Sequence, residues 1–322
     1  MKQYDVVALG ELLIDFTSNG MSTQNNPLFE ANPGGAPCNV LSMLAKLGKR
    51  VAFIGKVGDD AFGRQLEAAI EEVGIDGTGL CKDRRVHTTL AFVQKLANGD
   101  RDFSFYRDPG ADMMLSKEDI GLDLIRNTAI FHFGSLSMTD EVCREATKTA
   151  LDAAKKAGAI VSFDPNLREP LWKSLEAARE QIAYGMGQCD ILKISDNEIL
   201  WFTGKDGYDE AVDVIQQTYG IPLILLSMGP DGSRAYYHGM KVEVPAVLRN
   251  DTIETTGAGD TFCGCILNYI LDHGLDGLTE AELEEMLSFA NTAASIITTR
   301  KGALRVMPER AEIERELLQQ RN

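Results

Sequence analysis

The sequence of 322 residues is short of positive charge: 32 lysines and arginines stand against 48 aspartates and glutamates, for a net charge of −16. A chain this acidic repels nucleic-acid phosphates and anionic membrane surfaces unless it carries a basic patch. The sequence contains no run of Lys and Arg that could form one. We therefore expect neither a nucleic-acid partner nor a membrane partner.

Metal-binding and disulfide patterns are also missing. Six cysteines and four histidines are scattered singly, without a Cys-x-x-Cys pair. This spacing favours reduced thiols and argues against a structural zinc site or a disulfide framework. No apolar stretch approaches the ~20 residues of a membrane span, and Glu11 and Asp15 interrupt the N-terminal apolar run that a signal peptide would need. These features predict a soluble, cytoplasmic protein.

The sequence does contain a regular alternation of short apolar runs with segments of helical periodicity. Apolar runs typical of buried strands lie at 6–9, 51–54, 160–163, 191–194 and 223–227. Strands separated by helices favour right-handed crossovers, so we expect an α/β fold with a mostly parallel central sheet and helices on both faces. No Pro- or Ser-rich linker divides the chain, and the whole of it is expected to form one domain.

Two pairs of β-prone segments depart from this alternation. The later pair, at 88–94 and 102–106, flanks Asn98-Gly99, a strong signal for a hairpin turn. The earlier pair encloses a polar loop and could add to the hairpin. We expect a small sheet built from about 12–33 and 87–107. Periodicity leaves open whether it is a lid over an active site or an ordinary surface hairpin.

A glycine-rich segment, Glu254–Phe262 (ETTGAGDTF), precedes a helical run. Small residues at 257–259 let the backbone approach a bound group closely, and a helix that begins there directs N–H groups and its positive dipole end toward a phosphate. Asp260 suits a base that accepts a proton from an attacking hydroxyl during phosphoryl transfer. Taken alone, the segment is more typical of a glycine-rich turn with an aspartate as helix cap.

A second constellation lies near the N-terminus, where Asp15, Gly34, Gly35 and Asn39 combine polar side chains with bare backbone amides. Short donors and acceptors of this kind suit a polyhydroxylated ligand. The first strand would bring Asp15 to the carboxyl edge of the sheet, where ligands bind in such folds. The same residues could equally form a turn, a cap and a solvated acid.

Three further strands end in polar or glycine-rich segments, at 162–168 (SFDPNLR), 193–198 (KISDNE) and 227–233 (SMGPDGS). Any one of them could be an ordinary loop. Their recurrence at successive strand ends favours an active site at that edge of the sheet.

In their order along the chain, these segments resemble the ribokinase-like (pfkB-type) carbohydrate kinases over nearly the whole sequence. Gly34–Asn39 is similar to the N-terminal motif of the family, and Thr256–Phe262 is similar to its C-terminal signature. Within the family the chain most resembles bacterial fructokinases, through 105–112 (FYRDPGAD) and 164–172 (DPNLREPLW). The resemblance implies a ribokinase-like fold with the small sheet as a lid.

The resemblance also implies roles for individual residues. Asp260 would be the catalytic base, and the backbone amides of Gly257, Ala258 and Gly259 would bind the transferring phosphoryl group. The implied sugar-binding residues are Asp15, Gly34, Gly35, Asn39, Phe105, Arg107 and Arg168. The implied nucleotide-binding residues are Lys193, Glu198, Ser227, Gly229, Gly232, Gly259 and Asn291. ATP and Mg²⁺ would be needed, with Glu198 acting on the magnesium through water, and a potassium ion, where present, would be held by Glu254 and Thr256.

The reaction expected from the resemblance is ATP-dependent phosphorylation of D-fructose at its primary hydroxyl, giving fructose 6-phosphate. Other acceptors remain open: 2-keto-3-deoxygluconate, ribose or 5-dehydro-2-deoxygluconate, because Arg107 and Arg168 could bind a carboxylate. A sugar-binding sensor without catalysis is the alternative from another class, although a sensor has no need of Asp260. The resemblance further implies a homodimer formed through the lid.

Overall fold

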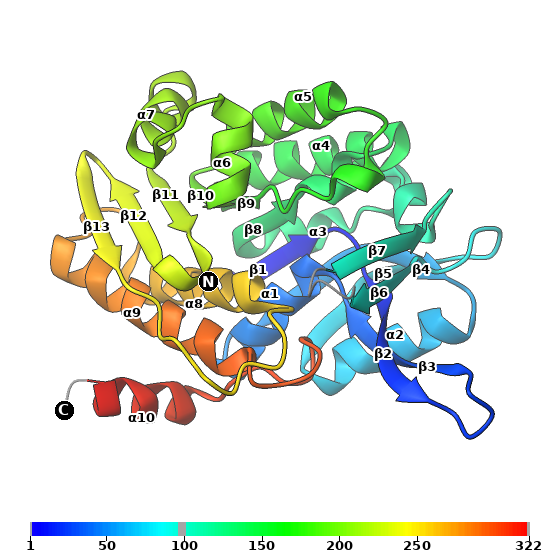
Figure 1. Cartoon of the computed structure of the whole chain (residues 1–322). Helices are drawn as coiled ribbons and strands as arrows, with labels where there is room; N and C mark the ends of the chain where they lie inside the picture. Colours follow the sequence, from blue (N-terminus) through cyan, green and yellow to red (C-terminus); the bar gives the residue numbers. More distant parts are fainter. Residues whose placement is uncertain (1, 96–100, 321–322) are drawn as a thin grey trace.

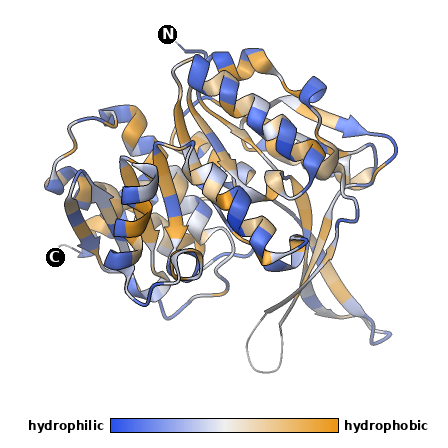
Figure 2. Cartoon of the chain, turned by 90° about the horizontal axis from the view of Figure 1, so that it is seen from above, coloured by the Kyte–Doolittle hydropathy of each residue, from blue (hydrophilic) through white to orange (hydrophobic). Residues whose placement is uncertain are grey.

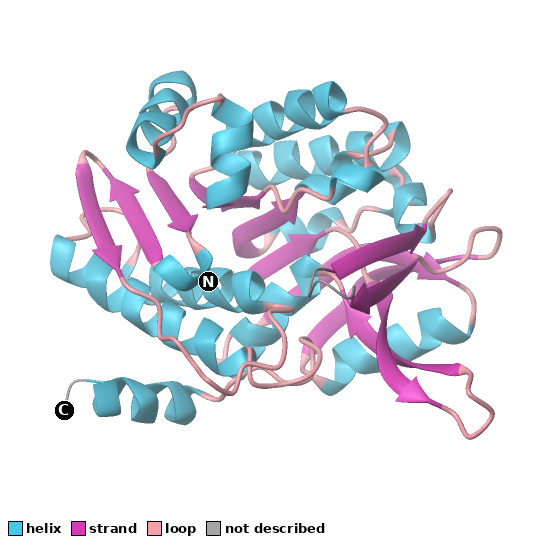
Figure 3. Ribbon diagram, in the orientation of Figure 1, coloured by secondary structure: helices cyan, strands magenta, loops and turns pink. Residues whose placement is uncertain are grey.

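The computed structural model describes residues 2–95 and 101–320. Within those ranges the chain forms a nine-stranded sheet, a four-stranded sheet and ten α-helices (Figures 1 and 3). Six neighbouring strand pairs of the large sheet are parallel, and the last two pairs at one edge are antiparallel. The predicted α/β class with a mostly parallel sheet is confirmed.

The large sheet has β9 at its centre, and β1 lies between β8 and β4. Its strands, in spatial order, are β13 (Met240–Val244), β12 (Ser233–Tyr237), β11 (Leu223–Ser227), β10 (Ile191–Ser195), β9 (Ile160–Asp164), β8 (Thr128–Gly134), β1 (Tyr4–Leu9), β4 (Val51–Gly58) and β5 (Ile75–Asp83). The parallel strands β1, β8, β9, β10 and β11 end at the same edge, so the polar segments that follow them are brought together there.

Helices cover both faces of the large sheet because successive side chains of a strand point to opposite sides. In β1, Val6 and Ala8 belong to one buried cluster, and Val7 and Leu9 belong to the other. The first cluster contains side chains of α1 (Ala36–Lys46), α2 (Ala61–Glu72), α8 (Ala258–His273), α9 (Glu280–Ile297) and α10 (Arg310–Gln320). The second is covered by α3 (Leu122–Arg126), α4 (Glu141–Lys156), α5 (Leu175–Met186), α6 (Asp196–Thr203) and α7 (Tyr208–Tyr219). Figure 2 shows the apolar strands between helices with hydrophilic outer faces.

The apolar runs did not reveal every strand of the large sheet: β5, β8 and the β12–β13 edge were not anticipated. In β8 the polar His132 interrupts the run. Its ring is nonetheless buried, with Nδ1 3.0 Å from the hydroxyl of Ser162 on the neighbouring strand. A polar residue satisfied across the sheet in this way gives no apolar signal in the sequence.

The small sheet lies beside the carboxyl edge of the large one (Figure 1). Its strands, in spatial order, are β3 (Pro27–Gly34), β2 (Leu13–Met21), β6 (Leu90–Lys95) and β7 (Arg101–Tyr106). The predicted pairing of β6 with β7 is present, while its Asn98-Gly99 turn lies outside the described residues. In the polar segment 18–27, expected to be a loop, residues 18–21 and 27 are strand, because β2 continues to Met21 and β3 begins at Pro27. Residues 18–21 are exposed, so they show no alternation of apolar and polar residues.

Among the described residues, no helix combines the length and the apolar character needed to cross a membrane.

Candidate active site

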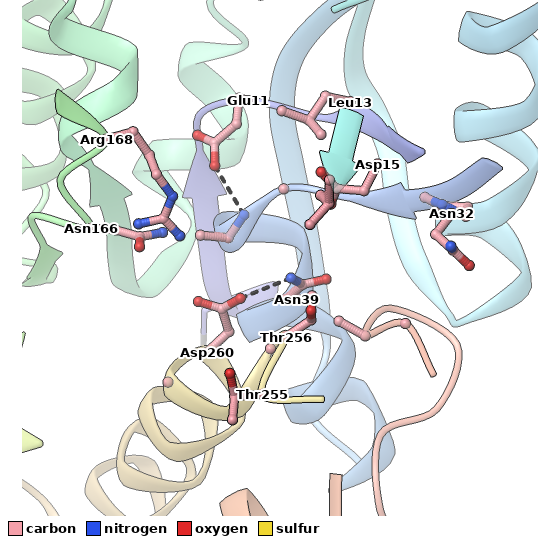
Figure 4. Close-up of a pocket in the computed structure, with 18 of the residues that line it drawn as sticks. Glu11, Leu13, Asp15, Asn32, Asn39, Asn166, Arg168, Thr255, Thr256 and Asp260 are labelled. Atoms are coloured by element: carbon pink, nitrogen blue, oxygen red, sulfur yellow. Dashed lines mark hydrogen bonds between the residues drawn. The ribbon is translucent and has the colours of Figure 1, made fainter. Parts of the chain in front are cut away.

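A cavity of about 260 Å³ opens at the carboxyl edge of the large sheet, bounded by the small sheet and by the start of α8. Segments that are distant in the sequence meet around it (Figure 4). The sequence-predicted site residues that line it are Asp15, Gly35, Asn39, Phe105, Arg168, Lys193, Glu254, Thr256, Gly257, Gly259 and Asp260.

Asp260 lies in the first turn of α8 and faces Asn39 of α1. The Asn39 side-chain amide donates to the Asp260 carboxylate at 2.8 Å (Figure 4). Burial raises the pKa of Asp260, against the hydrogen bond from Asn39 and the positive charges of Lys193 and Arg168. Asn39 Oδ1, by contrast, is buried with no partner among the described residues. The pair therefore offers the cavity a carboxylate that can take up a proton and an amide oxygen that still needs a donor.

The backbone at the start of α8 supplies unpaired donors. Ala258 N–H donates to the carbonyl of Thr255 at 3.2 Å, whereas the N–H groups of Gly257, Gly259 and Asp260 have no acceptor among the described residues. These amides stand at the positive end of a 16-residue helix, an arrangement that attracts an anion. The sequence analysis expected the backbone amides of Gly257, Ala258 and Gly259 to be available for an anion. In the structure the available amides include that of Asp260 in place of that of Ala258.

The two early glycines allow close contacts that a larger residue would prevent, with a carboxylate at Gly34 and with backbone at Gly35. A Cβ at Gly34 would lie 2.3 Å from Asp15 Oδ2, and Gly35 has a φ of +127°, which favours glycine. Gly34 is not among the cavity-lining residues; it permits the placement of Asp15 instead. Burial raises the pKa of Asp15 to about 7, with Arg168 opposing that shift and the charges of Asp260 and Glu254 adding to it.

Lys193, in the middle of β10, is paired with Asp164, the last residue of the neighbouring strand β9. Its ammonium lies 2.9 Å from Asp164 Oδ2, and both side chains are more than nine-tenths buried. Burial acts to lower the pKa of Lys193, but the charges of Asp164, Glu198 and Asp260 raise it above its ordinary value. Its Nζ would lie 3.1 Å from a Cβ at Gly259, so a buried cation stands directly beside the free amides of α8.

A second cavity of about 360 Å³ lies on the other side of Lys193. It is lined by Lys193, Arg168 and Glu198, and the first two also line the main cavity. Glu198 accepts hydrogen bonds from the N–H groups of Leu167 and Ser195, at 2.6 and 2.9 Å. Both of its carboxylate oxygens are thus engaged, which fits a residue that reaches a metal ion through water better than one that binds it directly.

The other nucleotide-binding residues of the sequence analysis lie beyond the main cavity, near the ends of β11 and β13. Gly232 has a φ of +100°, and a Cβ there would meet the Val244 carbonyl at 2.2 Å. Ser227 and Gly229 flank the same turn. Asn291 on α9 accepts from Ser233 and donates to the Val244 carbonyl, so its side-chain polar atoms are already partnered.

Arg107 is not brought to the cavity. Its guanidinium forms a buried ion pair with Asp112, 2.7 Å apart, and also donates to Thr139 and to the Leu136 carbonyl. The base of the small sheet is held by this residue, which leaves Arg168 as the arginine that lines the cavity.

Several cavity-lining residues received no role from the sequence. Glu11 is 4% exposed, and burial raises its pKa to about 7. Asn166 belongs to the polar segment 162–168 that follows β9, so its polarity was a usable signal, and Asn32 is a polar residue two positions before Gly34. Gly302 carried no such signal: it comes from the loop after α9, and its N–H donates to Glu254 Oε1 at 2.7 Å.

No cluster of three or more His, Cys, Asp or Glu side chains suited to holding a metal ion occurs in the described part of the chain. A metal ion here would therefore depend on oxygen atoms supplied by another bound group, such as phosphates.

Known proteins similar to this chain fall in one family. The model for "pfkB family carbohydrate kinase" matches residues 3–310. Probable fructokinase-2 of Arabidopsis thaliana is 43% identical over 312 residues, covering 95% of this chain and 94% of that protein. The fructokinase of Xylella fastidiosa with bound ATP has a TM-score of 0.87 at 31% identity, covering 98% of both chains. A double mutant of the Vibrio cholerae O395 fructokinase, with fructose, ADP and potassium ion bound, has a TM-score of 0.87 at 27% identity, covering 98% of this chain and 99% of that one.

Proposed function

The chain belongs to the pfkB family of carbohydrate kinases, and on this premise we propose that it is a fructokinase, which transfers the γ-phosphoryl group of ATP to D-fructose to give fructose 6-phosphate. One observation carries the proposal. A half-buried carboxylate, Asp260, and the unpaired amides of α8 share one cavity with the polar groups of Asp15 and Asn39. Phosphoryl transfer to an alcohol needs these two functions side by side.

Asp260 acts as the general base. Its raised pKa keeps the carboxylate basic enough to accept the proton of the sugar hydroxyl as that oxygen attacks the γ-phosphorus. The N–H groups of Gly257, Gly259 and Asp260, together with the Lys193 ammonium, stabilise the negative charge of the transferring phosphoryl group. Asn39 holds the base in orientation and keeps its Oδ1 for a sugar hydroxyl.

The small sheet acts as the lid over the sugar. Asp15 on β2, Asn32 on β3, Val93 on β6 and Phe105 on β7 all line the cavity, so each strand of this sheet contributes to it. Asp15 and Asn32 suit sugar hydroxyls, and the Phe105 ring covers the apolar side of the ligand.

A neutral sugar fits the charge of the cavity better than an acid. Asp15, Glu254 and Asp260 are among its acidic groups, and Arg168 and Lys193 are its cationic side chains. Lys193 is already paired with Asp164, and Arg107 with Asp112. The carboxylates of 2-keto-3-deoxygluconate and 5-dehydro-2-deoxygluconate would therefore have Arg168 as their remaining partner, and ribose is the neutral competitor.

ATP lies along the second cavity, with its phosphates toward Lys193 and its base toward the turn at 227–232. Glu198 would hold a phosphate-bound magnesium ion through water, and that ion would supply positive charge to the transferring phosphoryl group. Asn291 shapes the loop after β13 beside the nucleotide.

Glu254 and Thr256 offer oxygen atoms to a potassium ion, and since Glu254 Oε1 accepts from Gly302, its other oxygen and nearby carbonyls are the candidate ligands.

The test is a coupled ADP-release assay with purified enzyme, ATP and Mg²⁺ across four acceptors: D-fructose, 2-keto-3-deoxygluconate, ribose and 5-dehydro-2-deoxygluconate. We expect the highest kcat/KM with fructose, and faster turnover when potassium replaces sodium. A higher kcat/KM with another acceptor would change the assigned substrate. Sugar binding without ADP release from any of them would support the non-catalytic sensor.

We further propose that the enzyme is a homodimer joined through the lid. Its outer surface has large apolar side chains that are about half exposed, at 55%, 44% and 65% for Met21, Leu28 and Tyr106. Tyr106 also packs edge-on against Phe92 within the same sheet. Burying such a surface favours association, so sedimentation should find a dimer for the wild type and a monomer for Tyr106→Asp.

A cytoplasmic location completes the proposal. All six cysteines are free, and five of them are buried, as expected of a protein that folds in a reducing compartment.

A further inference from the structure

We propose that Glu11 is a positioning residue for the catalytic base: it holds the first turn of α1, and α1 carries the Asn39 that orients Asp260. The proposal rests on the proposed function, since it concerns the same site. It assigns a role to an acid that belongs to no motif used above.

The first step is the contact between Glu11 and α1. Glu11 follows β1, and its Oε1 accepts the N–H of Ala36, the first residue of α1, at 2.9 Å (Figure 4). The helix has no side-chain cap at Gly35 and no acid in its first turn. Because the first N–H groups of a helix lack acceptors within it and carry its positive dipole end, they need an outside acceptor. A carboxylate 25 positions earlier in the chain supplies it.

The backbone reinforces this contact. Gly35 has a φ of +127°, and a Cβ there would lie 2.4 Å from the Glu11 carbonyl oxygen. The start of α1 therefore rests on both the main chain and the side chain of Glu11. Any movement of Glu11 is transmitted to this turn.

The second step leads from the turn to the base. Asn39 N–H donates to the Gly35 carbonyl at 3.0 Å, so Asn39 belongs to the turn that Glu11 holds. Its side chain donates to Asp260 at 2.8 Å and is 5% exposed. A shift of the turn would thus change both the orientation of Asp260 and the position of the unpaired Asn39 Oδ1.

The rest of α1 is fixed independently. Gly264 of α8 lies so close to α1 that a Cβ there would be 2.8 Å from Met43 Cβ and 3.0 Å from the Val40 carbonyl. This close packing keeps the body of α1 against α8 when Glu11 is replaced. The loss of Glu11 should therefore disturb the first turn and the sugar side of the site, while the nucleotide side stays intact.

The matched variants are Glu11→Gln, which keeps an acceptor for Ala36, and Glu11→Met, which fills the same volume without one. We expect Glu11→Gln to stay within about threefold of the wild-type kcat/KM for the sugar, and Glu11→Met to lose about 10–100-fold, with the KM for ATP unchanged in both. In an Asn39→Ala background, Glu11→Met should lower kcat/KM for the sugar by less than about a further threefold. The effects of residues that act through one another are not additive.

Two kinetic results would overturn the proposal. Equal loss in Glu11→Gln and Glu11→Met would mean that the charge of Glu11 acts on the sugar directly, and full additivity with Asn39→Ala would mean that Glu11 does not act through Asn39. Crystal structures of both variants give a readout that does not depend on fructose being the substrate. Asn39 should stay within hydrogen-bond distance of Asp260 in Glu11→Gln and not in Glu11→Met, and an unchanged contact in both would contradict the inference. If Glu11→Met fails to fold, Glu11→Leu takes its place.

Discussion

At the scale of single residues, chemistry depends on a carboxylate whose surroundings set its proton affinity. Asp260 is held by Asn39 and lies near two cations, Lys193 and Arg168. Burial favours the protonated form and raises the pKa of Asp260, and these partners oppose that shift. The proton affinity of the proposed base therefore depends on its partners as well as on its burial.

The first prediction concerns this base. Asp260→Asn should lower kcat about 10²–10⁴-fold, because an amide cannot accept the hydroxyl proton, while ATP and sugar still bind. Steady-state kinetics and calorimetric titration of each ligand provide the measurement. Asp213→Asn, at an exposed position on α7, is the control and should behave like the wild type. Near-normal turnover of Asp260→Asn would remove Asp260 from the mechanism.

A second prediction at this scale separates backbone strain from steric contact. Gly257 and Gly277 have nearly equal φ values, +76° and +79°, but a Cβ at Gly257 would lie 2.6 Å from Ala303 Cβ, whereas at Gly277 nothing lies within 4 Å. Gly277→Ala should cost about 1–2 kcal/mol of unfolding free energy from the left-handed backbone alone. Gly257→Ala should cost more and also displace the amides of α8, so that kcat falls. Urea unfolding and kinetics test this; equal effects of the two variants would contradict it.

At the scale of elements, the main device is the attachment of the lid to the large sheet. Asp112 accepts from Thr89, just before β6, and pairs with Arg107, just after β7. The two strands of one hairpin are thus clamped at their inner ends by a single buried carboxylate. This attachment fixes the β6–β7 hairpin, whose Phe105 lines the cavity.

The third prediction tests this clamp. Arg107→Met and Asp112→Asn should each lower the unfolding free energy by about 3–5 kcal/mol, because each leaves a buried charge without its partner. The double variant Arg107→Met/Asp112→Leu should recover part of the loss, since no buried charge remains. The KM for the sugar should rise in the single variants as the lid loses its anchor. Single variants as stable as the wild type in urea would refute the clamp.

At the scale of the whole molecule, the acidic site makes stability depend on pH. Burial raises the pKa of Glu11 and of Asp15 to about 7 in the folded protein, against about 4 in an unfolded chain. At pH values between about 4 and 7, these two carboxyl groups have released their protons in the unfolded chain but still hold them in the folded protein. The free energy of unfolding therefore falls as pH rises through this range and levels off above it.

The fourth prediction follows from that sign. For the sugar-free enzyme, the unfolding free energy measured in urea should decrease from about pH 5 to about pH 7, each buried carboxyl contributing at most about 1.4 kcal/mol per pH unit. Asp15→Asn should flatten the decrease, because it removes one of the titrating groups. A profile identical to that of the wild type would show that Asp15 is ionised throughout.

The sequence predicted those parts of the protein that depend on local patterns. Apolar runs and helical periodicity identified most of the parallel strands, and the glycine-rich segment predicted to bind phosphate lies at the start of α8 beside the cavity. Patterns failed where tertiary contacts satisfied a polar residue, as at His132 in β8, or where a strand was exposed on both faces, as in the outer part of β2.

What the sequence by itself determined is the α/β class and the family, because both follow from the order of motifs and from side-chain periodicity along one chain. The tertiary structure alone decided the pairing of groups across long separations. It paired Arg107 with Asp112, away from the cavity. At the start of α8 it left the N–H of Asp260 without an acceptor in the described part of the chain, while the N–H of Ala258 bonds to Thr255. It also brought Glu11 to the start of α1. Hydrogen bonds and ion pairs act over a few ångströms, and only the folded chain fixes which groups come that close.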